Sequence, residues 1–208
     1  MWRITIYMAL NHEEIHQALM LLGELIDEAG QAPVHLIVCG GSALQAAAIV
    51  GRTTKDVDVL ARRGEIDGEI SMAYPLPAHV VQAATQVARE LHLPNNWFNA
   101  ATSLLTVPLE QLPAEVWSGL EEREYGRSLR LGYVGRVGLI YLKMSAVTGR
   151  DEQRDIEDLQ ALAPNRMECE AVLQWLKHCQ LIDQGNRTRL ESVLKELGHD
   201  ELSTGITE

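Results

Sequence analysis

Aromatic residues are scarce in this chain: they make up 5% of its 208 residues, with a single Phe. An aromatic-rich core is therefore excluded, and Leu, Val, Ile and Ala must fill the interior. Hydrophobic residues still reach 46% and charged residues 23%, which are ordinary values for a globular protein with a packed core. This length suits one large domain, or a core domain with a helical annex.

Long apolar runs are also missing. No stretch approaches the roughly 20 apolar residues that span a bilayer, so we expect no membrane association. The N-terminal stretch MWRITIYMALNHEE has no long apolar segment and no small-residue cleavage site, so no signal peptide is expected. Cys39, Cys169 and Cys179 form neither a metal-ligand spacing nor an even disulfide set. The sequence therefore predicts a cytoplasmic protein.

Positive charge is in short supply as well. Lys and Arg number 18 against 29 Asp and Glu, which gives a formal net charge of −11. This balance argues against broad, non-specific binding to nucleic acid, which depends on many cationic contacts to phosphate. Arginines are denser in one region, at Arg123, Arg127, Arg130 and Arg136. Acids at Glu121, Glu122 and Glu124 dilute them, so the pattern favours a mixed surface over a basic rim.

Periodicity divides the chain into helices and short strands. The predicted helices cover residues 11–29, 42–50, 78–91, 114–120, 137–148, 151–161, 167–179 and 184–197. The predicted strands cover residues 34–40, 56–61 and 129–135, the last paired with 120–125. Weaker patterns suggest a strand or ordered arm over 1–8 and a short strand within 97–107.

This order of elements predicts an α+β fold, in which helices flank a small mixed sheet and a helical segment follows. We expect an α+β core over residues 1–135 and a helical region over 136–208 packed on that core. No internal repeat or low-complexity linker interrupts the chain.

The segment from Cys39 to Gly64 carries the clearest chemical signal. Side chains two residues apart on a strand point to the same face, so Asp56 and Asp58 project together while Val57 and Val59 turn into the core. Two neighbouring carboxylates repel each other, and a bound cation removes that penalty. Mg²⁺, or Mn²⁺ in its place, takes carboxylate oxygens together with substrate phosphate oxygens. The pair therefore predicts metal-assisted phosphoryl chemistry.

The residues just before the first small-residue helix are suited to phosphate. Gly40 and Gly41 can adopt backbone angles closed to other residues, and they let a ligand approach the main chain. Ser42 is predicted at the helix start, where amides and the helix dipole attract a phosphate. Ser42 is equally explained as a helix cap.

This arrangement resembles the nucleotidyltransferase superfamily that includes DNA polymerase beta. The chain is most similar to the bacterial branch with Gly-Gly-Ser/Thr-Ala-Leu followed by Arg-x-Thr/Ser-x-Asp-x-Asp, which contains the abortive-infection toxins of type IV toxin–antitoxin systems. The matching residues here are Gly40, Gly41, Ser42, Ala43, Leu44, Arg52, Thr54, Asp56 and Asp58. The resemblance implies a nucleotidyltransferase-type sheet and transfer of a nucleoside monophosphate from an NTP to a hydroxyl of RNA (tRNA) or protein. It also implies a toxin–antitoxin or phage-defence setting, with a cognate toxin or antitoxin partner.

A second match lies downstream, in a Lys, Arg and Arg-Asp-x-x-Asp-Leu pattern. Its residues here are Lys143, Arg150, Arg154, Asp155, Asp158 and Leu159. The resemblance implies that Lys143 neutralises phosphate charge and that Asp155 or Asp158 serves as a base or a structural acid. The predicted strand 129–135 has no acid, although many family members carry a third carboxylate on a later strand. The alternative reading is therefore a non-catalytic relative that binds nucleotide or a partner, like an antitoxin.

Structural readings stand beside these functional ones. Arg52 either contacts phosphate or pairs with an acid such as Asp58, and Thr54 stabilises its turn. Lys143 equally fits a lysine whose stem covers apolar surface. Arg154 and Asp158 have the i, i+4 spacing of a helical ion pair. His35 is expected to be partly buried within its strand. A third hypothesis for the function is a helical interaction protein. Its C-terminal helices would carry the interaction, with a large apolar patch on them.

Overall fold

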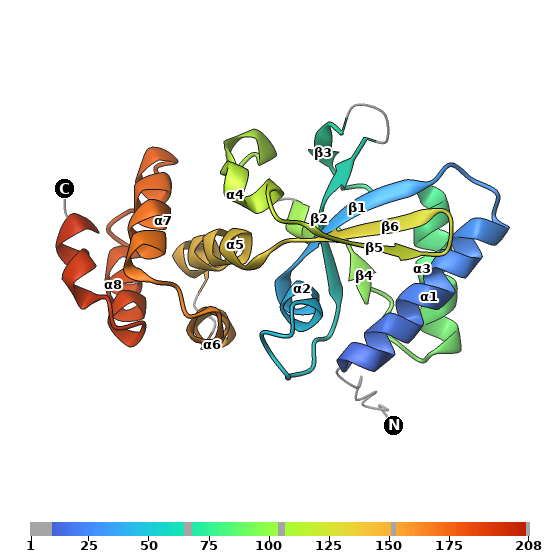
Figure 1. Ribbon diagram of the computed structural model, residues 1–208, viewed down its shortest axis with the longest axis horizontal. Coiled ribbons are helices and arrows are strands. Elements are labelled where there is room, and N and C mark those ends of the chain that lie inside the picture. The colour runs from blue at the N-terminus through green and yellow to red at the C-terminus, as the bar shows by residue number, and fades with distance from the viewer. Residues whose placement is uncertain (1–9, 65–67, 104–106, 151–152, 207–208) are drawn as a thin grey trace, which may run out of the picture. The chain divides into compact units, whose positions relative to one another are not determined.

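The computed structural model describes residues 10–64, 68–103, 107–150 and 153–206 (Figure 1). They form an α+β fold with a mixed sheet, flanking helices and a helical C-terminal segment, as predicted. The chain divides into two compact units. The sheet unit comprises Met1–Glu110 and Leu120–Val134, and the helical unit comprises Gln111–Gly119 and Gly135–Glu208. The arm predicted over residues 1–8 lies outside the described residues.

The sheet unit is built on six strands in the order β3-β2-β1-β6-β5, with β4 also paired to β2. The strands are β1 (Val34–Cys39), β2 (Val57–Arg63), β3 (Ile70–Met72), β4 (Phe98–Asn99), β5 (Glu121–Tyr125) and β6 (Leu129–Tyr133). Strand β1 runs parallel to β6 and antiparallel to β2. The predicted pairing of β5 with β6 is confirmed as an antiparallel hairpin.

Helices α1 (His12–Glu28) and α3 (Ala78–Glu90) pack side by side in this unit (Figure 1). Asn11 caps α1: its side chain accepts a hydrogen bond from the Glu14 amide at 3.0 Å, and the Glu14 carboxylate accepts one from the Asn11 amide at 2.8 Å. The apolar positions of α1 are buried, which confirms the predicted helix. The indole of Trp97 donates to the Ala84 carbonyl at 2.9 Å and anchors the chain after α3.

Strand register sorts the sheet residues onto two faces. Tyr125 of β5 packs against α1 and lies opposite Leu129 of β6, which in turn lies opposite Val34 of β1. His35, opposite Arg130 of β6, therefore points to the other face. Cys39, four residues further along β1, shares that second face with His35.

Gly23 sets the distance between α1 and the sheet. A Cβ atom at this position would lie 2.6 Å from the Tyr125 carbonyl carbon and closer still to its oxygen. We expect Gly23→Ala to lower the free energy of unfolding by about 3 kcal/mol or more, because α1 must move off β5. Urea denaturation followed by circular dichroism measures this loss. Gly51→Ala is the control, since its Cβ would meet open space; equal stability of the two variants would contradict the prediction.

The helical unit contains α4 to α8 and a final 3₁₀ segment, η3. Their bounds are α4 (Ala114–Trp117), α5 (Arg136–Gly149), α6 (Gln153–Leu162), α7 (Arg166–His178), α8 (Arg187–Glu196) and η3 (Asp200–Ile206). Its core is aliphatic, with Leu139, Ile140, Met144, Leu159, Val172, Leu176, Leu190, Val193 and Leu194 fully buried. The segment containing α4 joins this unit through the Trp175 indole, which donates to the Gln111 carbonyl at 2.9 Å.

Arg136 joins α5 to α7 in this unit. Its guanidinium donates to the Glu168 carboxylate at 2.6 and 3.1 Å, and to the carbonyls of Leu162 and Ala163 at 2.8 Å each. This arginine is therefore a packing element of the helical unit. In the described ranges, no helix is both long and apolar enough to cross a membrane.

Candidate functional site

Gly40 and Gly41 follow β1 directly and form the first turn of α2 (Gly40–Ala46). This Gly40–Gly41 turn lies against the Asp-x-Asp segment. Gly40 has φ +69°, in the left-handed region that favours glycine. A Cβ at Gly40 would lie 2.7 Å from Oδ2 of Asp58, and one at Gly41 would lie 2.7 Å from Oγ1 of Thr54. Both glycines are therefore required by close approach, and the two halves of the predicted motif meet in space.

Asp58 projects from β2 beside this turn. Its Cα pairs with Cys39 of β1 on one side and with Asn99 of β4 on the other. Val57 and Val59 are fully buried whereas Asp58 is half-buried, as the alternation predicts. Because Asp58 lies opposite Cys39, it points to the sheet face that carries His35, away from α1. Nδ2 of Asn99 lies 3.5 Å from Oδ1 of Asp58.

The other members of the first motif frame this turn. Asp56 immediately precedes β2, and its carbonyl accepts a hydrogen bond from the buried Thr54 hydroxyl at 3.4 Å. Ser42 is buried, and its hydroxyl donates to the Cys39 carbonyl at 3.2 Å. The predicted cap role of Ser42 is therefore wrong: α2 begins two residues earlier, its N-cap is Cys39, and no side chain caps it. Nη1 of Arg52 donates to the Thr53 carbonyl at 3.3 Å and lies 3.7 Å from the Cβ position of Gly41.

Helix α2 differs from its prediction at both ends. It begins at Gly40 and ends at Ala46, whereas periodicity predicts 42–50. The chain leaves the helix because Ala48 takes φ +54°, while Ala47 and Ala48 still donate to carbonyls of the last turn. Sequence reasoning also missed Gln45, whose amide donates to the carbonyls of Arg52 at 2.5 Å and Leu10 at 3.3 Å. The signal that could have indicated Gln45 is that it is a single long polar side chain within a helix of small residues.

Lys143, Asp155 and Asp158 form a buried ion cluster inside the helical unit. Nζ of Lys143 lies 2.7 Å from Oδ1 of Asp155 and 2.7 Å from Oδ2 of Asp158. Arg150 adds hydrogen bonds of 2.7 and 3.1 Å to Asp155. The side chains are 11% exposed for Lys143, 2% for Asp155 and 0% for Asp158. The second motif is therefore assembled as one cluster, and Lys143 does not extend its head group into solvent.

The cluster keeps Asp155 ionised. Burial by itself raises the pKa of the Asp155 carboxyl, but the hydrogen bonds and charges of Arg150 and Lys143 outweigh it, so the net shift is downward. A carboxylate held in this way is a poor proton acceptor near neutral pH. Its geometry fits charge stabilisation of the helices better than proton transfer.

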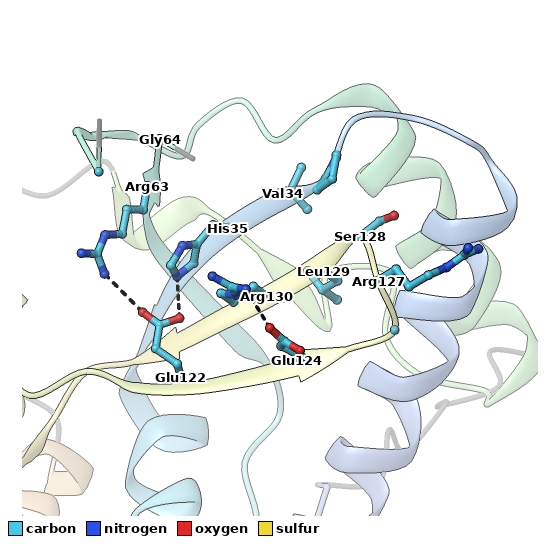
Figure 2. Close-up of a pocket in the computed structure, with 13 residues that line it drawn as sticks. Val34, His35, Arg63, Gly64, Glu122, Glu124, Arg127, Ser128, Leu129 and Arg130 are labelled. Atoms are coloured by element: carbon cyan, nitrogen blue, oxygen red, sulfur yellow. Dashed lines mark hydrogen bonds and ion pairs between the residues drawn. The ribbon is translucent and has the colours of Figure 1, made fainter. Parts of the chain in front are cut away.

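A pocket of about 580 Å³ opens on the sheet face that carries His35 (Figure 2). Figure 2 shows Glu122 of β5 between two bases, 2.8 Å from Nε2 of His35 and 3.2 Å from Nη1 of Arg63. On the same face Arg130 contacts Glu124 at 2.7 Å. These arginines are each paired with an acid, which agrees with the predicted mixed surface. Glu122 and Glu124, the acids nearest to strand β6, are thus engaged in ion pairs at this pocket.

His35 makes stability depend on pH. Burial lowers the pKa of its imidazole, with Arg63 and Arg130 acting in the same direction and Glu122 against them. Below the unfolded pKa of about 6.5, the unfolded chain therefore binds more protons at this position than the folded protein does. The contribution of His35 to the free energy of unfolding is complete above that pH and decreases as the pH falls below it. We expect His35→Gln to lose less thermal stability than the wild type between pH 7.5 and 5.5. The exposed His178→Gln serves as control, and identical pH profiles of wild type and His35→Gln would refute this role.

Acid clusters for a larger metal centre are not found in the part of the chain that the structure describes: no group of three or more His, Cys, Asp or Glu is placed to hold an ion. On the strand beside Asp58 the neighbouring position is Asn99, an amide. Among the described residues, the Asp-x-Asp segment therefore supplies two acids for an ion at the Gly40 turn, Asp56 and Asp58, and no group of three is placed there.

No family model, curated protein or solved structure matches the chain. The site is therefore interpreted from its own residues and from the motif they carry.

Proposed function

We propose that the sheet unit binds the nucleotide in a metal-dependent nucleotidyltransferase. One observation carries this proposal: the Asp58 carboxylate lies against the backbone of Gly40, at the turn between β1 and α2. A glycine pair lets phosphate oxygens reach main-chain amides, and the neighbouring strand supplies the oxygen ligands. Helix α2 has only seven residues, so the turn itself and not a helix dipole is the proposed phosphate seat.

The donor set fits Mg²⁺ or Mn²⁺. Asp56 and Asp58 are hard oxygen ligands two residues apart, and Mg²⁺ is commonly held by one or two carboxylates together with substrate phosphates. When bound, the cation neutralises charge on the phosphate oxygens of the NTP. The two aspartates thus suffice for a site that is completed by the nucleotide.

In the proposed reaction the acceptor hydroxyl oxygen forms a bond to the α-phosphorus. The bond from that phosphorus to the β-phosphate oxygen breaks, pyrophosphate leaves, and the hydroxyl proton passes to a base. Gly40 and Gly41 orient the triphosphate, while Thr54 and Ser42 hold the shape of the turn. Arg52, beside Gly41, is positioned to face a phosphate bound there.

The remaining assignments follow the motif resemblance. The resemblance implies that Lys143 neutralises phosphate charge and that Asp155 transfers a proton, but both side chains are buried and paired within the helical unit, so neither role is part of this proposal. The acceptor is proposed to be RNA (tRNA) or a protein, in a cytoplasmic toxin–antitoxin or phage-defence setting with a cognate partner.

A second candidate is a non-catalytic module that binds a nucleotide or a partner protein. It is favoured by one observation: the strand position beside Asp58 holds the amide of Asn99, and strand β6 carries no acid. Such a module would keep the Gly40 turn and lack transfer.

One assay separates the two candidates. The purified protein is incubated with each α-³²P-labelled NTP, with Mg²⁺ or Mn²⁺, and with total RNA or cell lysate. Covalent labelling of RNA or protein that EDTA prevents when it is present during the incubation supports the enzyme. Nucleotide binding without transfer supports the module, and the absence of both metal-dependent binding and transfer refutes the proposed function.

A further inference from the structure

Asn99 has a fixed orientation beside Asp58. Its Oδ1 accepts a hydrogen bond from the Ala101 amide at 2.9 Å, so the side-chain NH₂ must face the other way. That NH₂ lies 3.3 Å from the Asn96 carbonyl and 3.5 Å from Oδ1 of Asp58. The backbone thus settles which end of the amide meets the carboxylate.

The two oxygens of Asp58 face different neighbours. Oδ1 meets the Asn99 amide on β4, and Oδ2 lies beside the Gly40 turn. Asn99 and Asp58 are also partners in register, so the two side chains project from adjacent strands on the same face. The contact from Asn99 restrains rotation of the carboxylate and keeps Oδ2 directed toward Gly40.

We propose that Asn99 is a positioning residue for the metal-binding carboxylate of Asp58. It holds Oδ2 beside the glycine turn, where a cation and a phosphate would meet. This inference rests on the proposed function. Hydrogen-bonding partners that orient metal ligands typically change metal affinity by about 10- to 100-fold when they are removed.

The test measures Mn²⁺ affinity by electron paramagnetic resonance of the free ion, together with the melting temperature without metal. We expect Asn99→Ala to bind Mn²⁺ about 10- to 100-fold more weakly than the wild type. The exposed Asn95→Ala, a matched change in the same segment, should bind like the wild type.

Asn99→Asp separates positioning from loop capping. It keeps the acceptor for the Ala101 amide but sets a carboxylate against Asp58, so we expect a lower melting temperature without metal and Mn²⁺ binding at least as tight as in the wild type. Two results together would make Asn99 only a loop cap and the inference wrong. Asn99→Ala would bind Mn²⁺ like Asn95→Ala, and Asn99→Asp would match the wild type in both Mn²⁺ affinity and melting temperature. Failure of the wild type itself to bind Mn²⁺ at millimolar concentration, both alone and with an NTP analogue present, would instead overturn the metal site and the proposed function with it.

Discussion

Replacing Asp58 with asparagine should reduce metal-dependent label transfer by at least about 10³-fold. The change removes a charged oxygen ligand, and metal stabilisation of a phosphoryl transition state is worth several kcal/mol, at about 1.36 kcal/mol for each tenfold in rate. The fold should survive, because asparagine has the same shape and Asp58 is only half-buried. We expect a melting temperature within about 4 °C of the wild type, which corresponds to roughly 1 kcal/mol at this size. Initial rates with the preferred NTP and acceptor measure the effect.

Two further variants make this result specific. Asp56→Asn should show a loss of similar kind, because the same cation is proposed to use both carboxylates. Asp200→Asn, an exposed change in the helical unit, should transfer label at the wild-type rate. Full activity of a folded Asp58→Asn protein would mean that the Gly40 turn and its neighbouring aspartate do not form the catalytic centre.

Replacing Lys143 with methionine should destabilise the helical unit by about 3–5 kcal/mol. Lys143 neutralises two carboxylates at 2.7 Å, and removal of one partner from a buried ion pair leaves uncompensated charge. The lowered pKa of Asp155 means that this acid contributes stability above its unfolded value of about 3.9, and that the contribution is lost as pH falls through the folded pKa. Urea denaturation at pH 7 and at pH 3, which lies below the unfolded pKa of about 3.9, followed by circular dichroism, measures both effects. The stability gap between wild type and Lys143→Met should narrow at the lower pH.

Matched variants distinguish a structural cluster from a catalytic one. Lys177→Met removes an exposed lysine of α7 and should change stability by less than about 0.5 kcal/mol. The double variant Lys143→Met, Asp158→Leu replaces both charges by apolar groups and should recover much of the loss. If Lys143→Met retains wild-type stability but loses transfer, the lysine acts on substrate, and the structural role argued here is wrong.

The local elements were largely predictable from the sequence. Asn11 and Glu14 mark the start of α1 by a capping box that the structure contains in full. The alternation of Val57, Asp58 and Val59 correctly predicted that the two valines are buried and that Asp58 points to the opposite face, because a strand places successive side chains on opposite faces. The end of α2 was not predictable in this way, because small residues such as Ala47 and Ala48 fit a helix and a turn almost equally well.

Contacts between distant segments were beyond sequence reasoning. Gln45 bridges to Arg52 and Leu10, and Asn99 meets Asp58 across 41 residues. No periodicity connects such positions, since strand β4 has only two residues and gives no pattern. The sequence left two readings of Lys143, a functional cation or a lysine whose stem covers apolar surface, and the packing of α5 against α6 showed that it is paired with two buried acids.

Residue types and their spacing were enough to predict most of the elements and the chemistry available to them: a glycine turn, an Asp-x-Asp strand and a lysine with two aspartates. Those features depend on local backbone geometry and residue type, which neighbouring residues encode. Only the tertiary structure decided which of these groups meet, because strand pairing and helix packing join residues far apart in the chain. It placed Gly40 against Asp58 within the sheet unit, and it enclosed Lys143 among carboxylates within the helical unit.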